Sequence, residues 1–376
     1  MNFFHYYKSR QGEMVNLLKD LVRLESPSTD KMAVNKCSSF LAQELKKNGS
    51  KVTRYPQTDI GDLYVAEYPA KKSKERQEQI LLLTHIDTVW PVGKIEKMPF
   101  YLSGNKLNGP GVLDMKAGIV VAAYALKTLN DLNLVPEKKI ALFINSAEEI
   151  GNDSSYALIE KLAKKSSKVL CLEPSLPGGG LKIQRKGRLV VRLFTSGKAA
   201  HAGNPSLGVN AIDELMLQLR ALSKLKTKNT TLNIGVISGG EKANIVADKA
   251  EAVLDIRFWN NIQKQNILNY FKQLAPLLPE AHVKYKVESL TPPMEKTKGT
   301  LQLFKEVQEI AESLGLKLEA GKTGGGSDAS IASNMGIPTL DGLGPDGDGI
   351  HAENEHLILP SLVERAALLT ELLCRL

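Results

Sequence analysis

The sequence predicts an α/β protein with a mostly parallel sheet and helices on both faces, into which an α+β, ferredoxin-like domain is inserted. Three observations predict it. Continuous apolar runs alternate with helical segments in the first half, the pattern changes after residue 185, and helical spacing resumes after residue 292. The chain has 376 residues, more than the ~250–300 that one hydrophobic core usually serves, so we expect two domains.

The first part of the chain has the order expected of a parallel sheet with covering helices. Apolar residues recur at helical spacing within 11–48, and Ser26-Pro27-Ser28 interrupts them. The run at 63–68 alternates like a strand. Three continuous apolar runs predict strands that are buried on both faces, at 79–84, 139–146 and 168–172. Helical segments at 115–129 and 156–164 lie between these strands, which favours a mostly parallel sheet.

The middle of the chain predicts a separate β-α-β-β-α-β unit. Its strands are expected at 188–194, 232–238, 250–257 and 282–288, and its helices at 209–222 and 262–278. The loop PSLPGGG precedes it, and Thr291-Pro292-Pro293 closes it. Helices then resume at 301–314 and 362–373. We therefore assign 1–185 and 292–376 to one domain and 186–291 to an inserted domain.

Composition excludes several classes of protein. Hydrophobic residues make up 43% and charged residues 24% of the chain, as in globular enzymes. The net charge of +8 suggests a nucleic-acid binder, but the basic residues are scattered and no aromatic interleaving accompanies them. We expect no nucleic-acid partner and a bias toward small anionic substrates.

Features of the sequence also predict the compartment. Three widely spaced cysteines form no disulfide framework, and reduced thiols are typical of the cytoplasm. We see no signal peptide, and the apolar runs are too short to span a bilayer, which needs about 20 residues. A cytoplasmic protein without a membrane partner is expected.

Residues able to bind metal follow the three buried strands. His85 follows the first, with Asp87 two residues later; Glu148 and Glu149 follow the second, and Glu173 the third. Ligands of open α/β sheets bind beyond the carboxyl ends of the strands, so these side chains are expected to meet. Each one alone has an ordinary interpretation, such as a surface histidine beside an acid.

Two further residues complete the candidate site. Asp114 follows a glycine turn into a helix, where it could cap that helix or bridge two cations. His351 follows the glycine-rich stretch Gly342–Gly349, which would let the backbone approach a site. The chain has six histidines; His5, His282 and His356 are interpreted as surface residues. Zinc accepts mixed nitrogen and oxygen ligands, so the combination predicts a two-metal site.

The order and spacing of these residues resemble the M20 metallopeptidases, and within them the glutamate carboxypeptidase branch of the carboxypeptidase G2 type. The motifs that carry the resemblance are THIDTV (84–89), GPGVLDMKAG (109–118), SAEEIGN (146–152), LEPS (172–175), GKAAHAG (197–203), TGGGSDAS (323–330) and GIHAENE (349–355). The resemblance runs over nearly the whole chain. It implies a zinc-exopeptidase-like fold and hydrolysis of an amide bond next to a free carboxylate.

The resemblance also implies roles for the site residues. His85, Asp114 and Glu173 would bind one of two divalent ions, and Glu149 and His351 the other, with Asp114 bridging. Glu148 corresponds to the general base and Asp87 to the acid that supports His85. Zinc is the expected metal, with cobalt and manganese as alternatives.

For the inserted domain, the resemblance implies a lid that also forms a homodimer. Its His201 and Asn244 match residues that reach a substrate, and Arg257 and Gly326 match positions that bind the substrate carboxylate. Arg257 could instead form an ion pair with Asp255.

The expected substrate is a small peptide or an N-acyl amino acid. The glutamate-specific branch carries a further lysine and a further arginine on its lid, where this chain has Gly178–Leu181 and Thr291-Pro292. Lys182 or Arg185 would have to replace them. An N-acyl amino acid deacylase of the acetylornithine or succinyl-diaminopimelate kind is therefore the alternative activity, and a metal-binding protein without catalysis is the alternative class.

Overall fold

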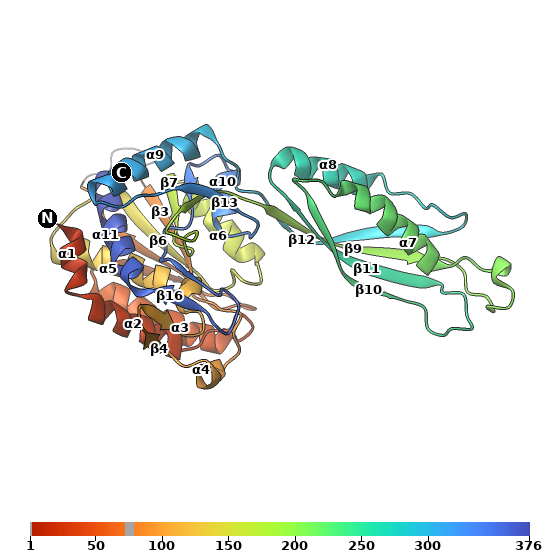
Figure 1. The fold of residues 1–376 in the computed structure, drawn as a ribbon, viewed down its shortest axis with the longest axis horizontal. Helices are drawn as coiled ribbons and strands as arrows, with labels where there is room; N and C mark the ends of the chain where they lie inside the picture. The colour runs from red at the N-terminus through yellow and green to blue at the C-terminus, as the bar shows by residue number, and fades with distance from the viewer. Residues whose placement is uncertain (1, 72–78) are drawn as a thin grey trace. The chain divides into compact units, whose positions relative to one another are not determined.

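A computed structural model describes residues 2–71 and 79–376 of the chain. It divides into two compact units. Unit 1 comprises Met1–Ile183, Lys296–Lys322 and Ser327–Leu376, and unit 2 comprises Gln184–Glu295 and Thr323–Gly326. Each unit has its own sheet and its own hydrophobic core (Figure 1).

Unit 1 is built on a six-stranded sheet. In spatial order, its strands are β1 (Lys51–Tyr55), β2 (Leu63–Tyr68), β6 (Lys139–Asn145), β3 (Gln79–His85), β7 (Ser166–Cys171) and β14 (Thr339–Leu340). The last four run parallel, whereas β1 and β2 are antiparallel to their neighbours. His85 pairs in register with Asn145. The carboxyl ends of β3 and β6 therefore coincide at one edge, as the sequence predicts.

Helices cover this sheet and complete a mixed α/β fold. Every residue of β3 is buried, as expected of a strand covered on both faces. Helix α5 (Ala117–Asp131) packs on β3 and on α11 (Leu359–Arg375), while α6 (Asp153–Ala163) contacts β6 and β7 (Figure 1). The remaining helices of the unit are α1 (Phe3–Lys8), α2 (Gln11–Arg23), α3 (Lys31–Lys47), α4 (Lys94–Lys97), α9 (Lys298–Ser313) and α10 (Ala329–Asn334).

Short polar side chains fix where several helices begin. The carboxylate of Asp30 accepts hydrogen bonds from the backbone at the start of α3, and the Asn152 side chain does the same for α6. The residues around Asp114 differ from the sequence prediction. Val112–Lys116 forms a π-helical turn, α5 begins only at Ala117, and Asp114 has extended backbone angles (φ −105°, ψ 98°). Asp114 does not cap α5, so that alternative interpretation is wrong.

Unit 2 contains a four-stranded antiparallel sheet with two helices. In spatial order, its strands are β10 (Thr231–Gly239), β11 (Lys249–Phe258), β9 (Gly187–Ser196) and β12 (His282–Thr291), and its helices are α7 (Ala211–Leu222) and α8 (Asn261–Lys272). Alternate residues of β9 and β11 are buried against a separate core. Helix α8 ends at Lys272 and is shorter than predicted; Pro276, which disfavours helical angles at Ala275, lies within the predicted range.

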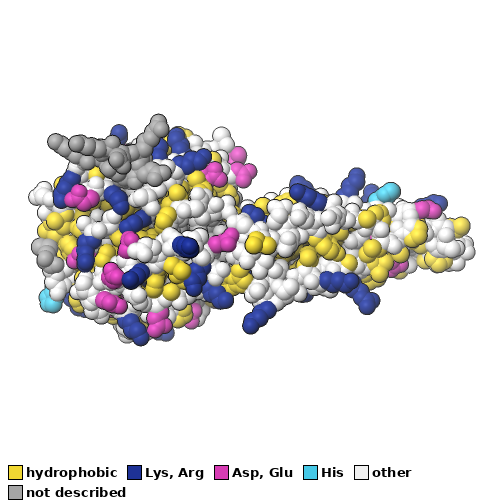
Figure 2. All heavy atoms as spheres, turned by 90° about the horizontal axis from the view of Figure 1, so that it is seen from above, with side chains coloured by type: hydrophobic (Ala, Val, Ile, Leu, Met, Phe, Trp, Pro, Cys, Tyr) yellow, Lys and Arg dark blue, Asp and Glu magenta, His cyan; other side chains and the backbone are white. Residues whose placement is uncertain are grey.

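Basic side chains are dispersed over the surface. On the face in Figure 2, Lys and Arg side chains are spaced among acidic, polar and hydrophobic atoms. The three cysteines are free thiols. No helix among residues 2–71 and 79–376 is both long and apolar enough to cross a membrane. One surface prediction is wrong: His356 is buried, because its strand β16 (His356–Ile358) pairs with β5 (Lys106–Asn108).

Candidate metal centre

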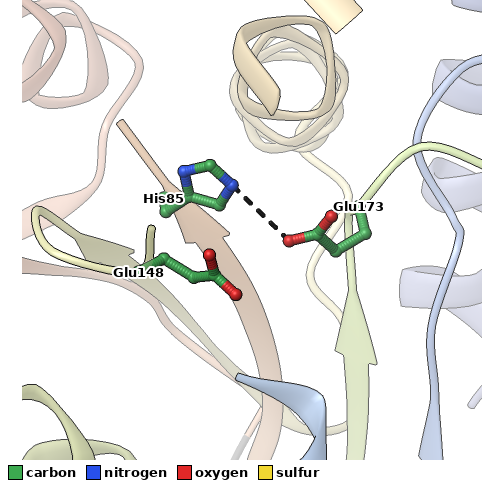
Figure 3. A group of neighbouring side chains, drawn as sticks. All are labelled: His85, Glu148 and Glu173. Carbon is green, nitrogen blue, oxygen red and sulfur yellow. Dashed lines mark ion pairs between the residues drawn. The ribbon is translucent and has the colours of Figure 1, made fainter. Parts of the chain in front are cut away.

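The carboxyl ends of three parallel strands bring acidic and imidazole side chains together in unit 1. His85 is the last residue of β3, Glu148 and Glu149 follow β6, and Glu173 follows β7. Figure 3 shows the His85 ring and the carboxylates of Glu148 and Glu173 facing one another as the three corners of a triangle. The Nε2 atom of His85 lies 3.5 Å from Oε1 of Glu173. The predicted edge of the sheet is thus where these groups meet.

Asp114 lies between the two histidines of the cluster. Its Oδ1 atom is 3.4 Å from Nε2 of His85, and its Oδ2 atom is 3.1 Å from Nε2 of His351. His351 also contacts Oε1 of Glu149 at 3.2 Å. Ligand atoms of His85, Asp114 and Glu149 lie within 4.8 Å of one another, as do those of His85, Glu148 and Glu173. The two oxygens of Asp114 therefore face two different histidines.

Asp87 supports both His85 and the turn after β6. Its backbone oxygen is 3.0 Å from Nδ1 of His85, closer than its carboxylate at 3.5 Å. The carboxylate accepts hydrogen bonds from the backbone N–H groups of Glu148 and Glu149, each at 3.2 Å, and from the Ser28 hydroxyl at 2.7 Å. The buried Asp87 side chain therefore links the segment after β3 to the turn after β6.

Glu355 performs the same task for the loop that carries Asp114. Its Oε1 atom accepts the backbone N–H groups of Leu113 (2.9 Å) and Asp114 (3.0 Å). Its Oε2 atom accepts the N–H of Gly111 (2.9 Å) and the indole N–H of Trp90 (3.0 Å). Glu355 is 1% exposed, so water does not compete for these bonds.

Close backbone approach places Glu173. A Cβ atom on Gly118 or Gly344 would collide with the backbone oxygen of Leu172, so larger residues would push these segments apart. The N–H of Gly344 donates to the backbone oxygen of Glu173 at 2.9 Å. The glycine at position 344 therefore lets the backbone before His351 approach the segment that carries Glu173. His351 itself has φ +61°, a left-handed conformation that is uncommon outside glycine.

The electrostatics of the cluster reflect an excess of buried carboxylates. Burial, with the nearby charges of Glu173 and Asp328, raises the pKa of Glu148 well above its usual value. Burial also raises the pKa of Asp328, to about 7. Hydrogen bonds to Asp114 and a second carboxylate raise the pKa of His351 to about 10. A nearby positive charge would lower the pKa of each of these groups.

The donor set fits divalent cations. Within residues 2–71 and 79–376, the buried Oδ1 atom of Asp114 forms no hydrogen bond; Nε2 of His85, at 3.4 Å, is itself a potential metal ligand, and a bound cation would compensate the carboxylate. Imidazole nitrogen and carboxylate oxygen are the ligands that zinc, cobalt and manganese share. The cluster is therefore a candidate metal-binding site.

Sequence reasoning overlooked four side chains that contact this region. These are Ser28, Asn145, Asp328 and Glu355. Asp328 and Glu355 lie within two of the motifs quoted above, and Asn145 directly precedes a third. For Asn145, Asp328 and Glu355, this position in or beside the motifs was the available signal. Their partners are backbone groups and distant side chains, which the sequence does not indicate.

The substrate-binding candidates all lie in unit 2. An isolated β-bridge joins His201 to Ile245, and the N–H of Ala202 donates to the Asn244 backbone at 3.0 Å. Both His201 and Asn244 are exposed. These two predicted residues are therefore neighbours on one surface of the unit.

Arginines of unit 2 bind the glycine loop. Arg257 pairs with Asp255 at 3.0 Å, as the alternative interpretation states, and also donates to the backbone oxygen of Gly324 at 2.9 Å. Arg185 donates to the backbone oxygens of Gly325 (3.2 Å) and Gly326 (2.8 Å). Three successive glycine carbonyls are thus held by two guanidinium groups.

Comparisons with known proteins identify the family of this chain. Residues 81–375 match the model of peptidase family M20/M25/M40. Carboxypeptidase G2 of Pseudomonas sp. (strain RS-16) is 32% identical over 371 residues, which cover 96% of this chain and 88% of that protein. Together they confirm the resemblance drawn from the motifs.

Solved structures show the same fold. Aminopeptidase PepT of Bacillus cereus ATCC 10987 superimposes with a TM-score of 0.78 at 24% identity, covering 96% of this chain and 98% of that one. Bacillus subtilis YXEP, a dinuclear metal binding peptidase of the M20 family, gives a TM-score of 0.71 at 16% identity, covering 98% of both chains. The mixed α/β prediction is confirmed. The chain therefore belongs to peptidase family M20/M25/M40 and is an enzyme of the metallopeptidase class.

Proposed function

We propose that the cluster of unit 1 binds two divalent ions, with zinc as the metal and cobalt or manganese as substitutes. His85, Asp114 and Glu173 would hold one ion, and Asp114, Glu149 and His351 the other. The observation that carries this proposal is the position of Asp114, whose two oxygens lie 3.4 Å from His85 and 3.1 Å from His351. Elemental analysis tests it: His85→Ala should reduce the metal content, and an unchanged stoichiometry would contradict the assignment.

The proposed reaction is hydrolysis of an amide bond with Glu148 as general base. Ions bound at such a site supply Lewis acidity and lower the pKa of water toward ~7. The Glu148 carboxylate takes a proton from the water that attacks the scissile carbonyl, and it then gives this proton to the leaving amine. The Asp87 carboxylate accepts the backbone N–H of Glu148 and so keeps Glu148 in place, and the Asp87 backbone oxygen orients His85. His201 would donate a hydrogen bond to the developing oxyanion.

We propose that the amide bond lies next to a free carboxylate, so that the enzyme is a carboxypeptidase. Similarity to carboxypeptidase G2 over 96% of the chain supports this class. The candidate residues for the substrate are His201, Asn244, Arg257 and Gly326. A guanidinium suits a carboxylate because it can donate two parallel hydrogen bonds. The Arg257 side chain is about one-third exposed, so it is accessible from solvent as well as paired with Asp255.

An N-acyl amino acid deacylase is the second candidate. Lys182 and Arg185 were the candidates to replace the missing basic side chains of the glutamate-specific branch. The Lys182 ammonium donates to the backbone oxygen of Pro174 at 2.7 Å, and Arg185 is bound to Gly325 and Gly326. Both are buried, which favours a substrate other than a C-terminal glutamate.

A substrate panel separates these activities. Metal-reconstituted protein would be assayed with dipeptides, acyl-glutamate, acyl-arginine and acyl-ornithine, each as the free carboxylate and as the carboxamide. A carboxypeptidase should prefer dipeptides and lose most of its activity on the carboxamide. Preference for acetyl or succinyl amino acids would favour the deacylase, and equal rates on the carboxamide would contradict recognition of the carboxylate.

A homodimer through unit 2 is also proposed, with the cytoplasm as the compartment. Strand β10 lies at the edge of its sheet and exposes Ile234 (40%), Val236 (54%) and Ile237 (56%). An edge strand with exposed apolar side chains readily pairs with another strand. Sedimentation velocity tests the dimer: Val236→Lys should shift the protein to monomer, and a monomeric wild type would exclude it.

A further inference from the structure

Three consecutive backbone N–H groups position the two glutamates after β6. Those of Glu148 and Glu149 donate to the Asp87 carboxylate, each at 3.2 Å. The N–H of Ala147 donates to Oδ1 of the Asn145 side chain at 3.1 Å. Because Asn145 is fully buried, no water replaces this acceptor. The turn that carries Glu148 is therefore held by two side chains, and only one of them has been given a role so far.

The amide of Asn145 works only in one orientation. Its oxygen must face Ala147, because a backbone N–H can only donate. Its nitrogen donates to Oδ2 of Asp328 at 2.7 Å, and Asp328 is 5% exposed. A carboxyl group has an acceptor oxygen in either protonation state, so Asp328 selects the orientation in which the Asn145 oxygen points at the turn. The Asn145 backbone oxygen also accepts the N–H of Ile86, the residue directly after β3, at 2.8 Å.

Ordinary structural roles do not account for Asp328. It precedes helix α10, yet its side chain does not cap that helix. The hydroxyl of the preceding Ser327 instead accepts the N–H of Ala329 at 3.3 Å. Within residues 2–71 and 79–376, Asp328 forms no ion pair with Lys or Arg, and its side-chain hydrogen bond is the one to Asn145. A buried acid without a cation destabilises a fold, so it calls for a compensating role.

We propose that Asp328 and Asn145 form a positioning pair that fixes the general base. Asp328 orients the Asn145 amide, and Asn145 fixes the turn from which Glu148 and Glu149 project. This inference rests on the proposed function for the role of Glu148, but the hydrogen-bonding part stands apart from it. Neither residue touches the reacting atoms in this scheme, so both are positioning residues.

The pair can be tested by reversing its polarity. Asn145→Asp places two carboxylates against each other and removes the donor. Adding Asp328→Asn to that variant restores a donor on the opposite side: the new amide donates to the new carboxylate, whose other oxygen still accepts the Ala147 N–H. A side chain needed for its own charge or proton would not be rescued in this way, whereas a positioning pair would be.

Two measurements apply to these variants. The first is amide hydrogen exchange of residues 147–149 in the metal-free protein, which does not depend on activity. Asn145→Asp should exchange about tenfold faster than wild type, and the double variant should return close to wild type. The second is hydrolysis of the best panel substrate. Here kcat should fall roughly 10–100-fold in Asn145→Asp with KM little changed, and most of it should return in the double variant.

A similar pair in unit 2 provides the control. The Gln218 amide donates to Glu214 at 2.8 Å, and both residues are buried. Gln218→Glu should destabilise its own unit and leave exchange at 147–149 unchanged. If Asn145→Asp does not fold, Asp328→Ala and Asp328→Asn replace it: alanine should speed exchange, while asparagine retains an acceptor for Asn145 and should not.

The outcomes are separable. Exchange in Asn145→Asp that equals wild type, or a folded double variant that remains as fast as the single one, overturns the positioning pair. If the wild type hydrolyses no substrate, or Glu148→Ala hydrolyses normally, the proposed function fails instead, and the exchange data alone decide the pair. Rescue of both exchange and kcat supports the proposal.

Discussion

The two units of this protein differ in where their charged side chains lie and in what those side chains contact. In unit 1, buried carboxylates gather at the ends of parallel strands, and the cations that face them are two histidines. In unit 2, charged residues pair across an antiparallel sheet near the surface. Arg192 bonds to Glu251 and Glu288, and Arg188 to Asp255. These three acids of unit 2 are thus each paired with an arginine, whereas unit 1 gathers buried carboxylates that an added cation would compensate.

The difference follows from topology. Parallel strands end at the same edge of the sheet, so residues that are far apart in the sequence converge there and become buried side by side. Neighbouring antiparallel strands place opposite charges side by side along their length, where solvent still reaches them. Burying several carboxylates at one edge creates a reactive site but destabilises the fold. Ion pairs across neighbouring strands stabilise the sheet slightly and have no catalytic role.

The largest effect is expected from removing the general base in unit 1. Glu148→Ala should retain the fold and the bound metal but lose about 10²–10⁴-fold in kcat, since no other group would take up the proton. Steady-state kinetics on the best panel substrate measures it. Glu160→Ala, an exposed glutamate on α6, is the control and should behave as wild type. Near-normal turnover of Glu148→Ala would contradict the mechanism.

Metal removal should lower the stability of unit 1 and leave the stability of unit 2 unchanged. Chelation should destabilise unit 1, because its carboxylates lose their counter-charge, and adding zinc at 100 times its Kd should restore about 2.7 kcal/mol. Hydrogen exchange resolved by peptide reports each unit separately. Protection should change in β3, β6 and β7 and remain constant in β9 and β11. Equal changes in exchange protection in both sheets would contradict the proposed difference between the two units.

The loop of Asp114 should depend on Glu355. Glu355→Gln replaces one acceptor oxygen by a donor, so two of four N–H groups lose their partner. Metal affinity should fall about 10–100-fold, as is typical for groups that orient metal ligands. Competition titration with a chelating dye measures this affinity. Glu353→Gln, two residues away and exposed, is the control, and an equal loss in that variant would argue against the role of Glu355.

The smallest effect is expected in unit 2. Burial raises the pKa of Asp255, but hydrogen bonds from Arg257 and Arg188 outweigh it, so the pKa is lowered overall. A lowered pKa stabilises the fold above the unfolded value of about 3.9, and this contribution disappears as pH falls through the folded pKa. Arg188→Ala should cost about 0.2–1 kcal/mol at pH 7 and less at pH 3. Thermal unfolding at both pH values measures it, and a larger loss at pH 3 would reverse the sign.

The sequence by itself determined the strands and the residues that end them. Hydrophobic runs at 79–84, 139–146 and 168–172 predicted buried strands, because only strands covered on both faces are apolar throughout. Parallel order then placed His85, Glu148 and Glu173 at one edge. Local residue chemistry was enough for this step, since each side chain follows its own strand directly.

Only the tertiary structure decided how those side chains are held. Glu355 accepts four N–H groups, all of them more than 240 residues earlier in the chain, and Asn145 depends on Asp328, 183 residues later. The backbone donors have no signature in the sequence, because every residue except proline carries the same N–H group. The extended backbone at Asp114 and the contacts of Arg185 with the glycine loop are of the same kind: they arise when distant segments pack, and packing cannot be read from local pattern.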